Sequence, residues 1–201
     1  FSATAPLKLA ARRYPFRAAT MPGFSRAMIP ALRLDYEEIN RRVHLLKTLL
    51  DDATSATCRF LVDASTQREF VIDLRHRTAH ASGGVFPDLG VAGNLPSGET
   101  YIVPYEGERA GDPSRTAGEL PVQLDDEVVL FRIEDNVATS ILSDGPVSRK
   151  EADLLRDEPA RGNIAELGLG VLAAFGLEPI GVVPCPVIRK MSSKRSNILC
   201  F

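Results

Sequence analysis

The stretch from Gly93 to Pro104 constrains the fold of this chain more than any other, because it joins a turn-rich loop directly to a β-type run. Two glycines and a proline punctuate the loop, since glycine permits positive φ angles and proline fixes φ and lacks a backbone donor. The run Thr100–Val103 consists of strong strand formers. The pattern predicts that Glu99 is the first residue of a strand, where a loop can present its carboxylate to a ligand. By spacing alone, a solvated glutamate fits the same position.

Length and composition narrow the classes of protein. The chain has 201 residues, of which 44% are hydrophobic and 25% charged, so it can bury a good core in one or two domains. A formal net charge of −2 gives no reason to expect nucleic acid or an anionic membrane as the partner. The apolar segment 164–183 is interrupted by acids, a proline and glycines, so no transmembrane helix is predicted.

Cysteine and histidine patterns argue against two common kinds of site. Three cysteines without a C-x-x-C motif predict neither a disulfide framework nor a cysteine-based zinc site, and they favour a reduced, cytoplasmic setting. His76 and His80 have the i,i+4 spacing of a zinc-binding helix, but the residues before them form a strand pattern. We therefore interpret both as solvated or hydrogen-bonding side chains at a strand end. His44, within a predicted helix, is not expected to be a ligand.

The clearest predicted helix runs from Asp35 to Ala53, with Asp35 as its N-cap and Glu38 completing a capping box. Its apolar residues recur at helical spacing. A shorter helix is predicted over 7–13, and another from Ser148, as N-cap, to Asp157.

Strand-like runs are predicted to form two hairpins. The first pairs 57–62 with 69–74, and the second pairs 127–133 with 136–142 across a turn at Glu134-Asp135. Because the chain lacks a βαβ rhythm, we expect an α+β fold with a mixed, mostly antiparallel sheet and two or three helices.

Two further carboxylates compete with Glu99. Glu119 lies in a polar stretch with turn residues, and its surroundings predict mobility, so it ranks well below Glu99. Glu166 follows Asn163, which could cap a helix whose dipole would stabilise the acid. Its small, apolar neighbours alternatively predict a partly buried carboxylate, and such groups are usually paired or bound to metal. The residues alone do not decide between these interpretations.

Three motifs, in order, resemble those of the thermophilic-type dinuclear metalloaminopeptidase family, which is aminopeptidase T/aminopeptidase S-like. They are GNLPSGETYIVP at 93–104, NIAELGLG at 163–170 and RAATMPG at 17–23. Three matches at plausible spacing are far more specific than any one of them. The resemblance covers roughly residues 1 to 181 and then ends.

The resemblance implies that Glu99 and Glu166 are metal ligands in a mixed α and β metal-binding domain. It further implies two divalent metal ions (Zn, Co or Mn), a peptide substrate, a homodimer, and an aminopeptidase that removes N-terminal residues. The family's downstream ligands, two histidines and an aspartate, have no counterpart, because no histidine follows His80. A two-glutamate site without imidazole binds transition metals poorly, so we expect weak or no metal binding and low or absent activity.

The same resemblance predicts the domain organisation. Residues 1–34 would be the remnant of an N-terminal domain and the interdomain segment, 35–181 a partial metal-site domain, and 182–201 a divergent basic tail. The two end regions carry basic and no acidic residues.

Three alternatives remain open. A related non-haem iron ring-cleaving dioxygenase of the dihydroxypyridine type resembles the same scaffold, and the absent ligands are what would separate it from the peptidase. A degenerate module that folds without turnover is the non-enzymatic alternative. The basic ends could also bind an anionic partner, although the four charges of 182–195, without aromatic residues, are weak support for nucleic acid.

Overall fold

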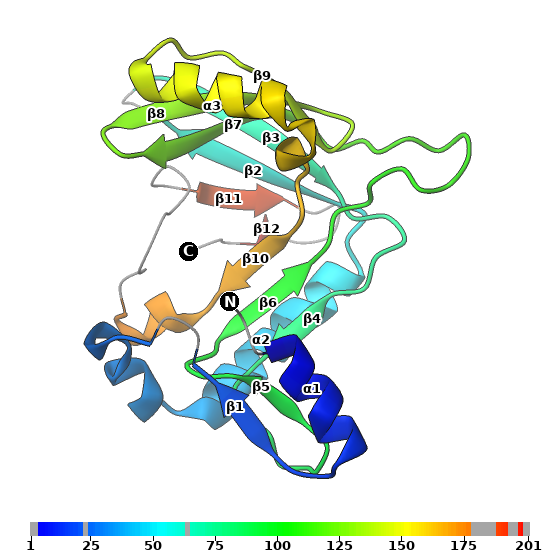
Figure 1. Ribbon diagram of the computed structural model, residues 1–201, viewed down its shortest axis with the longest axis vertical. Helices are drawn as coiled ribbons and strands as arrows, with labels where there is room; N and C mark the ends of the chain where they lie inside the picture. The colour runs from blue at the N-terminus through cyan, green and yellow to red at the C-terminus, as the bar shows by residue number, and fades with distance from the viewer. Residues whose placement is uncertain (1–3, 22–23, 63–64, 178–187, 193–196, 199–201) are drawn as a thin grey trace. The chain divides into compact units, whose positions relative to one another are not determined.

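The computed structural model describes residues 4–21, 24–62, 65–177, 188–192 and 197–198 (Figure 1). The chain forms two compact units. Both units are assembled from separate stretches of sequence. Unit 1 comprises Phe1–Thr48, His80–Tyr101 and Gly168–Glu178, and unit 2 comprises Leu49–Ala79, Ile102–Leu167 and Pro179–Phe201.

Helices and antiparallel strands dominate the described part of the chain, which confirms the predicted α+β class. The α-helices are α1 (Thr4–Arg13), α2 (Tyr36–Asp51) and α3 (Pro146–Asp157). The strands are β1 (Ala18–Thr20), β2 (Ser55–Leu61), β3 (Gln67–Asp73), β4 (His80–Ser82), β5 (Ala92–Asn94), β6 (Glu99–Ile102), β7 (Ala117–Leu124), β8 (Glu127–Glu134), β9 (Val137–Ile141), β10 (Leu167–Gly170), β11 (Ile188–Ser192) and β12 (Asn197–Ile198). Short 3₁₀ helices lie at η1 (Arg26–Met28), η2 (Pro30–Arg33), η3 (Pro159–Gly162) and η4 (Leu172–Phe175).

A seven-stranded sheet of order β12-β11-β2-β3-β7-β8-β9 forms the body of unit 2 (Figure 1). Each neighbouring pair is antiparallel, and both predicted hairpins, β2–β3 and β8–β9, are present. Alternate residues of the inner strands point into the core, among them Phe60, Phe70 and Ile72. Cys58 is buried in the same core, and burial raises the pKa of its thiol to about 12. Cys185 and Cys200 lie outside the described residues.

The turn of the β8–β9 hairpin differs from the prediction by one residue. Asp135 and Asn136, rather than Glu134 and Asp135, occupy its centre, with φ angles of 49° and 72°. Two consecutive positive φ angles are those of a type I′ turn, whose twist matches a right-handed hairpin, and Asn tolerates this conformation well. Composition was enough to predict the hairpin, but the need for two residues that tolerate positive φ angles determines which residues form the turn.

The N-terminus of α3 is also different from the predicted one. Gly145 is the N-cap and Pro146 the first helical residue, so Ser148 lies inside the first turn and is buried. The carboxylate of Glu127 instead accepts hydrogen bonds from the backbone N–H groups of Val147 and Ser148, at 2.9 and 3.0 Å. An acid from a neighbouring strand thus performs the capping that the sequence assigned to a local serine.

Helix α2 organises unit 1, and the sequence predicted it well. The Oδ1 atom of Asp35 accepts hydrogen bonds from the N–H groups of Glu37 and Glu38, as an N-cap does. The carboxylate of Glu38 binds Arg41 and Arg42 along the helix, a different role from the predicted capping box. The inner face of α2 buries Ile39 and Val43 against Val171.

Two small sheets complete the fold. A three-stranded sheet has the order β10-β6-β4, and β1 pairs in parallel with β5. The predicted boundaries at residues 34 and 181 stay predictions. Within the tail predicted from residue 182, Ile188–Ser192 forms β11 and pairs with β2, whereas 182–187, 193–196 and 199–201 lie outside the described residues.

Candidate functional site

The loop from Gly93 places Glu99 where the sequence predicted it, as the first residue of β6. β6 is the central strand of its sheet, with β10 on one side and β4 on the other. The carbonyl oxygen of Gly98 accepts a hydrogen bond from the N–H of Val171, at 2.9 Å. A side chain at Gly98 would collide with Leu172, because an ideal Cβ there lies 2.5 Å from its Cδ2. The segment that follows β10 therefore packs closely on the backbone that precedes Glu99.

The same loop is held from its other end by β1. The hydroxyl of Thr20 donates to Oδ1 of Asn94 at 2.8 Å, and the carbonyl of Thr20 accepts from the N–H of Leu95 at 2.9 Å. The fold thus brings 17–21 beside the start of 93–104, two of the three segments that carry the family resemblance. Pro22 and Gly23 lie outside the described residues.

The carboxylate of Glu99 is exposed and lies over Gly168 of β10. An ideal Cβ at Gly168 would come 2.2 Å from its Oε1, so glycine at this position leaves room for the carboxylate in its present orientation. The carboxylate of Glu99 therefore lies at the start of β6, next to a glycine of the neighbouring strand β10; its role as a metal ligand stays a prediction.

Glu166 directly precedes β10, the strand next to β6. Its side chain is exposed, so the expectation that its apolar neighbours would bury it is wrong. Asn163 does not begin a helix: it forms a β-bridge with Val137, and its Oδ1 accepts from the Asn136 side chain. Leu167 and Leu169 of β10 are buried, whereas Ala165 and Glu166, which precede the strand, are exposed. The role of Glu166 as a metal ligand stays a prediction.

His80 lies at a strand end, as expected, His76 follows β3 in a turn, and His44 lies on the surface of α2. His80 is the first residue of β4 and stacks on Tyr101 of β6, with ring centroids 5.1 Å apart. His76 lies in a turn with a φ angle of 63°, so the pair does not share a helix. His44 is exposed on α2, with Nδ1 2.8 Å from the carbonyl oxygen of Asn40.

Glu119 is better ordered than its sequence predicted. It lies within β7, and its carboxylate binds Arg68 at 3.0 Å and Arg132 at 3.1 Å. The expectation of a mobile polar stretch is wrong, because cross-strand pairing extends to Ala117.

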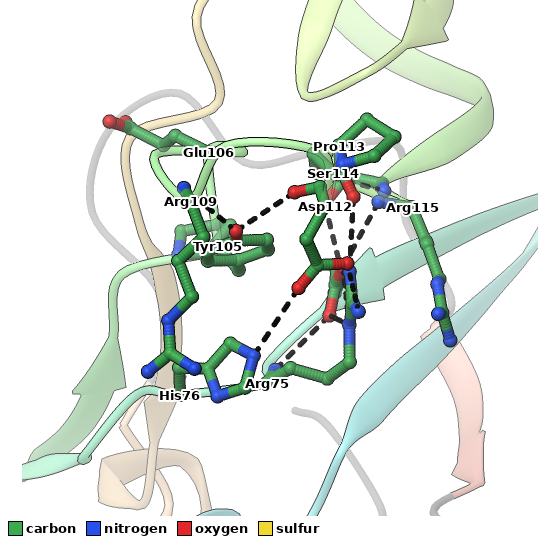
Figure 2. Close-up of polar contacts among 12 residues, drawn as sticks. Arg75, His76, Tyr105, Glu106, Arg109, Asp112, Pro113, Ser114 and Arg115 are labelled. Atoms are coloured by element: carbon green, nitrogen blue, oxygen red, sulfur yellow. Dashed lines mark hydrogen bonds and ion pairs between the residues drawn. The ribbon is translucent and has the colours of Figure 1, made fainter.

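An unforeseen polar network in unit 2 centres on Arg75, directly after β3 (Figure 2). Its guanidinium forms a two-point ion pair with Asp73, at 2.9 and 2.7 Å, and binds Asp112 at 2.7 Å. Asp73 is 1% exposed and Arg75 15%. Further donors to Asp73 are the N–H groups of Arg75 and Arg115, at 3.1 and 3.0 Å. The carboxylate is therefore buried with several of its lone pairs satisfied.

The network fixes the loop between β6 and β7. The hydroxyl of Tyr105 donates to the carbonyl of Asp112 at 2.8 Å and accepts from the N–H of Arg109 (Figure 2). Nε2 of His76 lies 3.5 Å from Asp112, with its ring edge-on to that of Tyr105. Arg77 binds Glu108 and the carbonyl of Pro104. Side chains from one short turn thus hold the whole loop.

The pKa values of both acids in this network are lowered. Burial by itself raises the pKa of Asp73, but the hydrogen bonds from Arg75 and from two backbone N–H groups outweigh it and hold that pKa below its ordinary value. The guanidinium of Arg75 likewise lowers the pKa of Asp112. Both acids are ionised and paired at neutral pH, an arrangement that suits anchoring a loop rather than accepting a proton.

Metal-binding capacity rests on the two predicted glutamates. Across the residues with described positions, no cluster of three or more His, Cys, Asp or Glu side chains is placed to hold a metal ion. Two carboxylates alone are a poor site for the transition metals that the resemblance implies, because these metals favour imidazole or thiolate ligands. The residues present therefore do not by themselves fit a tight dinuclear centre. No helix in the described ranges is long and apolar enough to cross a membrane.

Comparison with known proteins supports the fold. No protein-family model matches the chain, and no curated protein matches it significantly. The structure is similar to that of 2,5-dihydroxypyridine dioxygenase from Pseudomonas putida KT2440, with a TM-score of 0.62 and 20% sequence identity over 89% of this chain and 52% of that one. Wild-type AmpT from Thermus thermophilus gives a TM-score of 0.49 and 17% identity over 79% of this chain and 38% of that one. The chain thus spans about half the length of the dioxygenase.

Proposed function

We propose that the chain carries part of the catalytic domain of a metal-dependent, aminopeptidase-type hydrolase, which removes N-terminal residues from peptides, and that these 201 residues alone bind metal weakly. The observation that carries the proposal is the position of Glu99. Glu99 is exposed at the first position of β6. The other two motif segments lie nearby: 17–23 contains β1, which pairs with β5, and 163–170 contains β10, which neighbours β6.

Glu99 and Glu166 would be the carboxylate ligands of two divalent ions, Zn, Co or Mn. A bound ion of this kind would supply a water of lowered pKa for hydrolysis. The contribution of this chain would be carboxylate oxygens, from Glu99 at the start of β6 and from Glu166 directly before β10. Peptide substrate, cytoplasmic setting and a homodimeric assembly belong to the same proposal.

The test measures metal content and affinity of the purified chain, together with its hydrolysis of a leucyl anilide. Glu99→Gln and Glu166→Gln remove the proposed ligands, and Glu37→Gln, at an exposed position of α2, is the matched control. We expect weak binding that is lost in the first two variants and kept in the control. Binding that is equal in all four proteins would contradict both ligand assignments.

A second candidate is a non-haem iron ring-cleaving dioxygenase. The likeness to a solved dioxygenase, at a TM-score of 0.62, favours it as an alternative on the same scaffold. If the chain consumes oxygen with Fe²⁺ and 2,5-dihydroxypyridine but does not hydrolyse the leucyl anilide, the dioxygenase function would replace the hydrolase function as the better account. If no variant differs in metal binding and neither substrate is converted, the degenerate, non-enzymatic module becomes the better account.

A further inference from the structure

A cavity of about 320 Å³ lies within unit 2, between helix α3, the 3₁₀ helix η3 and the face of the sheet formed by β7 and β8. Its volume is at the lower end of the range typical of small-molecule sites. Asn163 and Ile164 of the 163–170 segment line part of the cavity, whereas neither of the proposed metal ligands, Glu99 and Glu166, does.

The walls of this cavity are apolar because of strand alternation. Leu120, Val122 and Leu124 are every second residue of β7, so they share one face of the sheet. Phe131 pairs with Leu120 in the register of β8, and extends the same face. These side chains remain half-buried although α3 packs on β8 and β9 (Figure 1). Apolar surface is therefore left for an occupant.

Charged groups gather at one side of the cavity. Glu151 precedes Leu154 and Leu155 by three and four residues, which places an acid on the stripe of α3 that faces the sheet. Arg161 of η3 also lines the cavity, but its Nε already donates to Glu158, at 2.5 Å. Glu158 first, and then Glu151, raise the pKa of Arg161. Glu158 does not line the cavity, but its pairing with Arg161 leaves Glu151 as the lining acid that, among the described residues, has no ion-pair partner of its own.

We propose that this cavity binds a small apolar molecule that carries a primary ammonium group, with the ammonium at Glu151 and the apolar body against β7 and β8. Glu151 favours a cation over an anion, because a ligand carboxylate would meet this acid while Arg161 is already engaged by Glu158. The apolar walls select against strongly hydrated cations. Charge complementarity therefore defines the ligand as an aliphatic or aromatic amine.

The test uses three probes with the same hydrocarbon chain: hexylamine, hexanol and hexanoate. Binding to the full chain is followed by calorimetry and by NMR shifts of the backbone amides of β7 and α3. We expect hexylamine to bind more tightly than both other probes. Glu151→Gln should weaken hexylamine about tenfold or more, since a charge-assisted contact is lost, and should leave hexanol unchanged.

Two further variants separate the pocket from general effects. Asp153→Asn removes an acid from the exposed side of the same helix, where it pairs with Arg156, and should leave hexylamine binding unchanged. Val122→Phe fills the cavity and should abolish binding of all three probes, with thermal unfolding confirming that the variant is folded. Equal binding of hexylamine and hexanoate, or an unchanged affinity of Glu151→Gln, would overturn the proposal, as would the absence of shifts in β7 and α3.

Discussion

At the scale of single residues, Asp73 is the side chain whose loss we expect to be most costly. It is buried beside Arg75 and accepts hydrogen bonds from two backbone N–H groups. Asp73→Asn removes the two-point partner of Arg75 and leaves it paired with Asp112 alone, so we predict a loss of about 2 kcal/mol in the free energy of unfolding. Urea titration measures it. Glu69→Gln, on the same strand but in an exposed pair with Arg59, should cost less than about 1 kcal/mol.

The pH dependence of stability has a defined sign at this residue. Because the folded pKa of Asp73 is lowered, its contribution is fully present above the ordinary aspartate pKa of about 4 and is lost as the pH falls through the folded value. Wild-type stability should therefore fall below about pH 4 more steeply than that of Asp73→Asn. Parallel stability curves for the two proteins over this range would show that Asp73 has no such linkage.

Residue-level prediction succeeded where the signal was local. Glu99 was placed correctly because the glycines, the proline and the strand formers that define its position are its immediate neighbours. Asp112 and Tyr105 were missed because they meet Arg75 across about 30 or more residues of sequence, and nothing in their own surroundings indicates the partner. The exposure of Glu166 was missed for a related reason, since the composition of its neighbouring residues fits a buried helix as well as an extended segment at a sheet edge.

At the scale of elements, the β8–β9 turn depends on both the backbone and the side chain of Asn136. Its Nδ2 donates to Oδ1 of Asn163 and to the carbonyl of Ile164, at 3.0 and 2.9 Å. Asn136→Ala loses these bonds and places alanine at positive φ, so we predict a cost of about 3 kcal/mol. Asn136→Gly loses the bonds but tolerates the backbone, and should cost about 1 kcal/mol less than alanine.

Chemical denaturation of both variants separates the two contributions. Asp135→Gly, at the other central position of the turn, is the control and should change stability by less than about 1 kcal/mol, because Asp135 also has a positive φ angle. Equal losses for alanine and glycine at 136 would mean that backbone conformation contributes nothing there.

Element boundaries show what sequence can and cannot supply. The stripe of α2 and the alternation of β2 and β3 are periodic patterns within one element, and they predicted those elements to within about two residues. The start of α3 was misplaced because its capping acceptor, Glu127, is 20 residues away on β8. A serine followed three residues later by an acid is a valid local signal for a helix N-cap. In α3, however, the distant acid Glu127 accepts the hydrogen bonds that the serine was predicted to accept.

At the scale of the whole molecule, the segment predicted as a basic tail contributes strand β11 to the edge of β2. Local composition suggested an anionic partner for this segment, whereas its pairing indicates a structural role. Deleting 182–201 removes β11 and β12, and exposes the edge of β2, whose Cys58 and Phe60 belong to the core. Uncovered strand edges promote association, so the truncated chain should elute from size exclusion as aggregate.

A second variant decides whether strand or charge matters in this segment. Replacing Arg189, Lys190, Lys194 and Arg195 with glutamine keeps the length of the chain but removes the positive charge. If β11 is the important feature, this variant should elute and unfold like the wild type, because backbone hydrogen bonds to β2 do not require the charges. If the basic side chains serve an anionic partner, the variant should lose retention on a phosphocellulose column while the wild type elutes late and in a salt-dependent manner. A truncated chain that stays soluble and unfolds cooperatively would contradict the structural role, since it would show that β2 tolerates a free edge.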